Sequence, residues 1–217
     1  MDKRPSPTIT IIGVVVVLIA TGLFVWGIMY KPAYGSSVVI NRWVVTHQSP
    51  KHITIRLDIL PAIGYGPHAD WIGYTAPDHK HSPNVIDLPK NSDVTLIIHN
   101  YDSQTAPRNQ YFSLVQGTIG GREQVTPYKE STRTVQVMNP QVMSHTFTIP
   151  DLGVSVPMMG VGDNAPATAY DIMKFTFRTH GAGKYRWQCI VPCGFGLYGF
   201  GGPMQELGYM DGLFVVS

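Results

Sequence analysis

The sequence of 217 residues predicts an all-β domain, a sandwich or barrel, preceded by one membrane-spanning helix. Short apolar runs rich in valine, isoleucine, threonine and aromatic residues recur between many glycines and prolines, which is typical of strands joined by turns. After the first thirty residues, no segment keeps a 3.6-residue period over more than two turns. The predicted strands are 38–46, 52–59, 85–88, 94–100, 111–115, 132–137, 146–149, 173–178, 184–190 and 213–216.

Residues 10–30 carry no charge, and about twenty apolar residues in a helix suffice to cross about 30 Å of hydrocarbon. Basic residues precede this run, so the positive-inside rule places residues 1–9 in the cytoplasm. A cleaved signal peptide is the alternative, but the apolar run exceeds the usual length of about 7–15 residues. We expect a single-pass protein of the cell membrane, with a linker at 31–37 and an extracytoplasmic domain at 38–217.

Several function classes are excluded by composition and motif context. The net charge is only +2 and the basic residues are scattered, so nucleic acid is not an expected partner. Ser144 and His145 form no hydrolytic triad, because neighbouring strand residues point to opposite faces and no acid orients the histidine. The glycine-rich stretch 194–202 runs between predicted strands, so it is not a phosphate-binding loop before a helix.

The last third of the chain holds the most informative motifs. Four segments stand in order: SHTFTIPDLGV at 144–154, GKYRWQC at 183–189, PCG at 192–194 and MDGLFVV at 210–216. The two cysteines, Cys189 and Cys193, are the only ones in the chain. This arrangement closely resembles the cupredoxin domain of subunit II of the haem-copper respiratory oxidases, in which such segments hold a binuclear copper centre. The resemblance implies a cupredoxin-like Greek-key β-sandwich.

The resemblance also implies a set of copper ligands. Soft thiolates together with imidazole and thioether are the donors that select copper. For the methionine of the site we expect Met210, because an M-x-G segment leads into the last strand, with Met204 as the alternative. The other positions that match the ligands of the family are His145, Cys189, the carbonyl of Val191, and Cys193.

One ligand of the family is absent from the sequence. Leu197 occupies the position of the second histidine, and no histidine follows His180. Weaker candidates for completing the site are Met204, Gln205, Glu206 and the remote His99, which otherwise is a hydrogen-bonded histidine at a strand edge.

Three interpretations of the cysteines stay open. An unusual copper site is the first. In the second, copper has been lost and the cysteines form a disulfide or stay reduced, as in quinol oxidases whose subunit II keeps the fold without the metal. A tight C-x3-C turn can supply the Cα separation that a disulfide needs, about 4.4–6.8 Å. The third is a membrane-anchored cupredoxin-like copper-binding or assembly module outside an oxidase.

The family resemblance implies a role in aerobic respiration, as an electron-transfer or structural subunit of a cytochrome c or quinol oxidase. Haem is expected only in a partner, the haem-bearing oxidase subunit I, because one span cannot enclose it. An electron-donor protein or quinol is the other expected partner, and no independent catalytic site is found in the chain. Trp187 is either a core residue or a contact for that donor, and residues 61–83, 157–169 and 194–209 are expected to form long loops.

Overall fold

The computed structural model describes residues 15–23, 42–44, 52–194 and 201–217. The chain divides into two units, Met1–Val38 and Val39–Ser217. In the first unit, residues 15–23 form a helix with exposed side chains, while the remainder of the predicted span 10–30 lies outside the described residues. Within the described ranges, no helix has both the length and the apolar character needed to span a membrane. The membrane anchor therefore stays a prediction.

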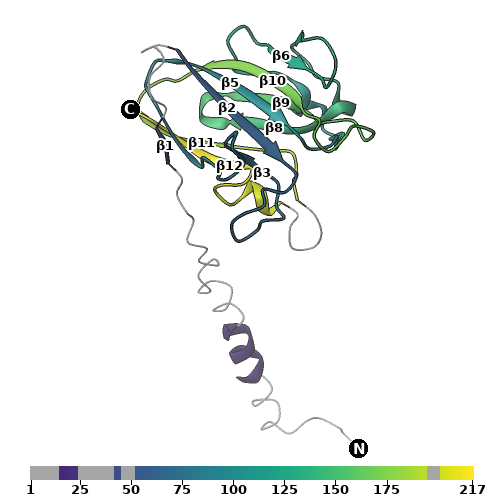
Figure 1. Ribbon diagram of the computed structural model, residues 1–217. Helices are drawn as coiled ribbons and strands as arrows, with labels where there is room; N and C mark the ends of the chain where they lie inside the picture. Colours follow the sequence, from purple (N-terminus) through teal and green to yellow (C-terminus); the bar gives the residue numbers. More distant parts are fainter. Residues whose placement is uncertain (1–14, 24–41, 45–51, 195–200) are drawn as a thin grey trace, which may run out of the picture. The chain divides into compact units, whose positions relative to one another are not determined.

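The second unit is a β-sandwich of two six-stranded sheets, so the predicted all-β class is confirmed (Figure 1). In one sheet the strand order is β1-β4-β12-β11-β8-β9, and in the other it is β3-β2-β5-β10-β6-β7. Both sheets are mixed, because β4 pairs in parallel with β1 and β12, and β2 pairs in parallel with β5. The strands are β1 (Arg42–Val44), β2 (His52–Leu60), β3 (Gly73–Thr75), β4 (Val85–Leu88), β5 (Asp93–Asn100), β6 (Glu123–Thr126), β7 (Arg133–Val135), β8 (Met143–Ile149), β9 (Val154–Met159), β10 (Asp171–Arg178), β11 (Gly183–Gln188) and β12 (Asp211–Val216).

The hydrophobic core lies between the sheets and follows the two-residue period of the strands. Along β10, buried residues alternate with half-buried or exposed ones, so Phe175 and Phe177 point into the core. Trp187 is only 1% exposed and stacks on Phe147 at 5.1 Å between ring centroids, which confirms that it is a core residue. Full burial of side chains of this size contributes about 1.5–3 kcal/mol each relative to exposure.

The predicted strand at 111–115 is wrong. Residues Gln110–Ser113 form a 3-10 helix, η1. Asn109 begins it, because its side-chain oxygen accepts a hydrogen bond from the backbone N–H of Tyr111 at 3.0 Å. Three strands, β3, β6 and β9, were not predicted, and β3 lies inside the expected long loop 61–83. The other 3-10 helices among the described residues are η2 (Pro140–Val142), η3 (Pro150–Leu152) and η4 (Gly202–Met204).

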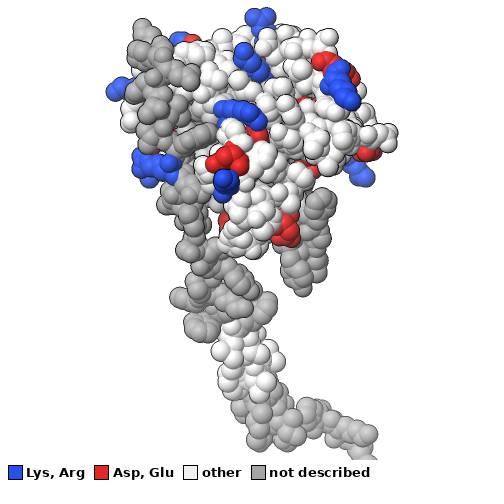
Figure 2. Space-filling model, viewed as in Figure 1, with Lys and Arg blue, Asp and Glu red and all other residues white. Residues whose placement is uncertain are grey.

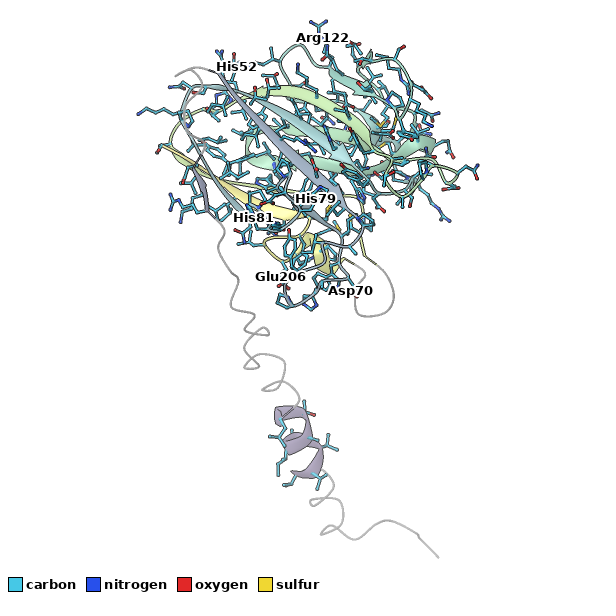
Figure 3. All side chains as sticks on the ribbon, viewed as in Figure 1. His52, Asp70, His79, His81, Arg122 and Glu206 are labelled. Carbon is cyan, nitrogen blue, oxygen red and sulfur yellow. The ribbon has the colours of Figure 1, made fainter. Side chains whose placement is uncertain are left out.

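The segment 61–83 packs against the loop 201–209 at one end of the sandwich. Figure 3 shows Asp70 and Glu206, one from each loop, at that end, with Arg122 at the opposite end. The backbone N–H of Tyr74 donates to the carbonyl of Tyr209 at 2.8 Å. Charged side chains are scattered over the face of the sandwich in Figure 2, with no patch of one sign.

Candidate metal centre

The pairing of β8 with β11 brings His145 to the cysteines. Gln188, the last residue of β11, lies opposite Thr148 of β8 in antiparallel register. Cys189 follows at once, and its N–H donates to the carbonyl of Met210 at 2.9 Å, just before β12. Three neighbouring strands of one sheet therefore support the cysteine loop.

His145, Cys189 and Cys193 form one buried cluster whose potential ligand atoms all lie within 4.8 Å of one another. Nδ1 of His145 is 3.2 Å from Sγ of Cys193 and 3.9 Å from Sγ of Cys189. The two sulfur atoms are 3.3 Å apart, and both thiols are free. The structure thus brings together the one imidazole and the two thiols that the sequence singled out.

The carbonyl of Val191 faces the same cluster. Its oxygen lies 3.2 Å from Sγ of Cys189 and 3.0 Å from Sγ of Cys193. This fourth donor atom lies where the sequence prediction put it, beside both sulfur atoms.

Thr146 holds the first cysteine in place. Its backbone N–H donates to Sγ of Cys189 at 3.4 Å, and its hydroxyl accepts from the N–H of Ile190 at 2.9 Å. The hydroxyl of Tyr74 in turn donates to the carbonyl of Thr146 at 3.3 Å. Sequence reasoning missed both residues, and no local signal marks Tyr74, because its strand lies within a loop rich in glycine, proline and histidine.

The two candidate methionines differ in how they meet the cysteine loop. The thioether sulfur of Met204 accepts a hydrogen bond from the backbone N–H of Cys193 at 3.4 Å. Met210, the first choice from sequence, is fully buried and contacts Cys189 through its backbone carbonyl. Both methionines therefore contact the cysteine loop, Met204 through its sulfur and Met210 through its backbone.

The remaining candidates lie outside the cluster. Oε2 of Glu206 is 3.6 Å from Nε2 of His68. His99 belongs to β5 of the other sheet, where its ring stacks on Tyr170 at 4.5 Å between centroids. Leu197, which stands where the family has its second histidine, lies outside the described residues.

The protonation of the cluster is set by its internal contacts. Burial by itself raises the pKa of Cys189, but hydrogen bonds from Cys193 and His145 outweigh it and bring the pKa well below its usual value. The hydrogen bond to Cys189, together with burial, raises the pKa of Cys193. Burial lowers the pKa of His145, but hydrogen bonds to Asp102 and Cys189 outweigh it and raise the pKa to about 9. These contacts therefore favour the ionised form of Cys189, the protonated thiol of Cys193 and the charged imidazolium of His145.

Asp102 completes the cluster on the far side of the imidazole. Its Oδ2 is 2.8 Å from Nε2 of His145, whose side chain is 2% exposed, while the Asp102 side chain is 14% exposed. The sequence-based expectation that no acid orients His145 is therefore wrong. The only sequence feature that could have pointed to Asp102 is its place just after a hydrophobic strand. No motif connects it with His145, 43 positions later.

The donor set fits a copper ion. Two sulfur atoms, an imidazole nitrogen and a thioether are soft ligands that favour Cu(I), and a carbonyl oxygen is a usual weak additional ligand. All of these groups except Met204 are on buried residues, so few water molecules compete for the metal. The described residues place one imidazole at the cluster, which suits a single ion better than the two ions of a binuclear centre.

Comparison with known proteins adds structural neighbours but no family. No family model matches the chain, and no curated protein sequence matches it. The structure is similar to the metal-binding domain of the Cu(I)-exporting P-type ATPase CopA of Streptococcus pneumoniae D39, with 13% identity, a TM-score of 0.35, and coverage of 82% of this chain and 97% of that one. It is also similar to reduced rusticyanin, with 14% identity, a TM-score of 0.35, and coverage of 84% and 89%. Rusticyanin from Thiobacillus ferrooxidans gives 14% identity, a TM-score of 0.34, and coverage of 82% of each chain. Likenesses of this degree leave the function to be inferred from the residues of this chain.

Proposed function

We propose that this chain is a cupredoxin-like copper protein that transfers electrons at the outer side of a membrane, as a subunit II-like component of a haem-copper terminal oxidase. The observation that carries the copper proposal is the buried cluster of His145, Cys189 and Cys193, with ligand atoms within 4.8 Å of one another. Such a combination of imidazole and thiolates on a rigid β-sandwich suits a redox metal, because the ligands move little when the charge changes.

In this proposal Nδ1 of His145 and both sulfur atoms would hold the copper, with the Val191 carbonyl and the sulfur of Met210 or Met204 as weaker ligands. Copper supplies one-electron redox chemistry when it is bound. The protein supplies the geometry. The first cysteine is tied to β8 through Thr146 and to the start of β12 through Met210, so the position of the Cys189 sulfur is set by the fold.

The oxidase assignment is supported by the family resemblance of the last third of the chain and by the apolar segment 10–30. Under this proposal a haem-bearing subunit I receives the electrons, and a redox protein or quinol donates them. A copper-binding or assembly module outside an oxidase is the competing proposal. The two differ in whether the chain stays with a large haem-bearing membrane protein.

The copper proposal is tested by purifying the full chain from membranes and measuring its metal content and free thiols. We expect copper, with absorption bands from sulfur-to-copper charge transfer, and their complete loss in both Cys189→Ser and Cys193→Ser. His99→Gln is the matched control and keeps both copper and spectrum, because His99 lies in the other sheet. A Cys189–Cys193 disulfide without copper, or zinc in place of copper, contradicts the proposal.

The oxidase role is tested separately by mild solubilisation and affinity capture of the full chain. Recovery of stoichiometric haem with the chain supports a subunit role. Copper-loaded chain that is recovered without haem supports the competing module.

A further inference from the structure

His145 is contacted on both sides of its ring by groups of different chemistry. Oδ2 of Asp102 lies 2.8 Å from Nε2, and Sγ of Cys193 lies 3.2 Å from Nδ1. An ionised carboxylate only accepts hydrogen bonds, so the ring must carry a proton on Nε2 in this contact. Which nitrogen of a histidine binds a metal is set by the hydrogen bond that the other nitrogen makes. The contact with Asp102 therefore leaves Nδ1 to face the thiols.

A buried hydrogen-bond network holds Asp102 in this position. The side-chain oxygen of Asn100 accepts from the N–H of Asp102 at 3.0 Å. The amide nitrogen of Asn100 donates to Oγ of Ser144 at 2.7 Å and to the carbonyl of Met159 at 2.6 Å. Asn100 is fully buried, and Ser144 directly precedes His145. One amide thus ties the loop that carries Asp102 to the strand that carries the imidazole.

The residues just after β9 also contact the loop that carries Asp102. The N–H of Val161 donates to the carbonyl of Asp102 at 2.9 Å. Gly160 lets the two segments approach, because a Cβ at this position would lie 2.6 Å from the backbone oxygen of Ser103. The position of Asp102 is therefore set by two independent neighbours and not by its contact with His145 alone.

We propose that Asp102 is the positioning residue of the metal site: it keeps a proton on Nε2 of His145 and directs Nδ1 toward the ion held by the cysteines. The proposal rests on the proposed copper function. A carboxylate that holds a metal-binding histidine in this way typically changes metal affinity by about 10–100-fold when it is removed. Its negative charge also makes the imidazole a stronger electron donor, which stabilises the oxidised ion and lowers the reduction potential.

The first test uses the metal-free, reduced full chain labelled with ¹⁵N in its histidines. In the wild type we expect a slowly exchanging ring proton on Nε2 of His145 in the NMR spectrum. Asp102→Ala removes the acceptor and loses this signal, whereas Asp102→Asn keeps an acceptor oxygen and retains it. An Asp102→Ala spectrum with the same slowly exchanging proton contradicts the proposal.

The second test measures Cu(I) affinity by competition with a chelator, and the reduction potential of the copper-loaded chain. We expect Asp102→Ala to bind copper about 10–100-fold more weakly, and both Asp102 variants to have a higher potential than the wild type. Asp163→Ala, which removes an exposed aspartate from the loop after β9, leaves both quantities unchanged.

The two tests separate positioning from simple structural support. A purely structural Asp102 changes the free energy of unfolding but leaves the potential of folded Asp102→Asn at the wild-type value, and that result contradicts the proposal even if Asp102→Ala fails to fold. A wild-type chain that binds no copper contradicts the proposed function and the positioning role with it. Wild-type affinity in Asp102→Ala contradicts the role of Asp102 alone.

Discussion

His145 and His99 lie on strands of opposite sheets, and their surroundings reverse the effect of burial. Both ring nitrogens of His145 have partners, the Asp102 carboxylate and the sulfur atoms, and its pKa rises to about 9 although burial opposes the charge. Nδ1 of His99 is buried without a hydrogen-bond partner among the described residues, and burial lowers its pKa. Charged partners, and not depth, therefore decide which histidine is suited to a chemical role.

Replacing each histidine in turn tests whether His145, and not His99, binds the copper. We expect His145→Ala to lower copper affinity by at least about 100-fold, because one of three strong ligands is lost and its cavity leaves the thiolates unsupported. His99→Ala should leave copper affinity unchanged. Competition titrations with a Cu(I) chelator measure both, and equal losses in the two variants contradict the assignment of His145 as the ligand.

The pH dependence of copper binding tests whether His145 and Cys193 carry protons in the metal-free site. At neutral pH the metal-free site keeps one proton on Nδ1 of His145 and one on Cys193, since both pKa values are raised. Copper must displace both protons, so affinity rises with pH, about tenfold per pH unit for each proton, and the histidine contribution ends near pH 9. Calorimetry in buffers of different ionisation enthalpy counts the protons released. Release of no protons at pH 7 contradicts the ion-pair description of the metal-free site.

Glu123 extends the comparison to a carboxyl group without partners. It is 1% exposed, neither carboxylate oxygen has a hydrogen-bond partner among the described residues, and burial raises its pKa well above 4.5. The folded state then binds more protons than the unfolded state, so its stability falls as the pH rises from about 4.5 toward the raised pKa.

Urea unfolding of the metal-free chain tests this effect. Glu123→Gln should flatten the pH dependence of the unfolding free energy by up to about 1.4 kcal/mol per pH unit in that window. Asp151→Asn, at an exposed carboxyl group, is the control. A slope that stays the same in Glu123→Gln contradicts the raised pKa.

His99 itself gives the smallest expected effect. Because its folded pKa is lowered, the folded state binds fewer protons below pH 6.5, and stability is lost as the pH falls from about 6.5 toward the lowered pKa. We expect His99→Gln to lose less stability than the wild type between pH 6.5 and 5. His180→Gln, at an exposed residue shortly after β10, is the control. A wild-type slope in His99→Gln contradicts the lowered pKa.

Strands with a clear two-residue period were predicted well. Residues 85–88 match β4, and 52–59 and 94–100 differ from β2 and β5 by one residue at one end. The predictions for short segments failed because of local sequence features. The run at 111–115 has strand-forming residues, but Asn109 caps a 3-10 turn there. β3 lies between turn residues and is only three residues long, so its pairing with β2 leaves almost no local pattern.

In the candidate site, too, the sequence identified some residues and missed others. Cys189, Cys193 and His145 were identified because the segments around them resemble the copper-binding segments of the oxidase subunit II family. Both candidate methionines contact the cysteine loop, Met204 through its sulfur and Met210 through its backbone carbonyl. Whether the apolar segment 10–30 spans a membrane stays a prediction from sequence.

By itself, the sequence determined the all-β class, most strands of the sandwich and the residue types that could bind a soft metal, because hydrophobic alternation, turn residues and side-chain chemistry are local properties. Only the tertiary structure decided that Asp102 faces His145 and that His99 does not join the cysteines. Those contacts depend on which strands become neighbours. Asp102 and His145 are 43 positions apart, and no local sequence pattern predicts their contact.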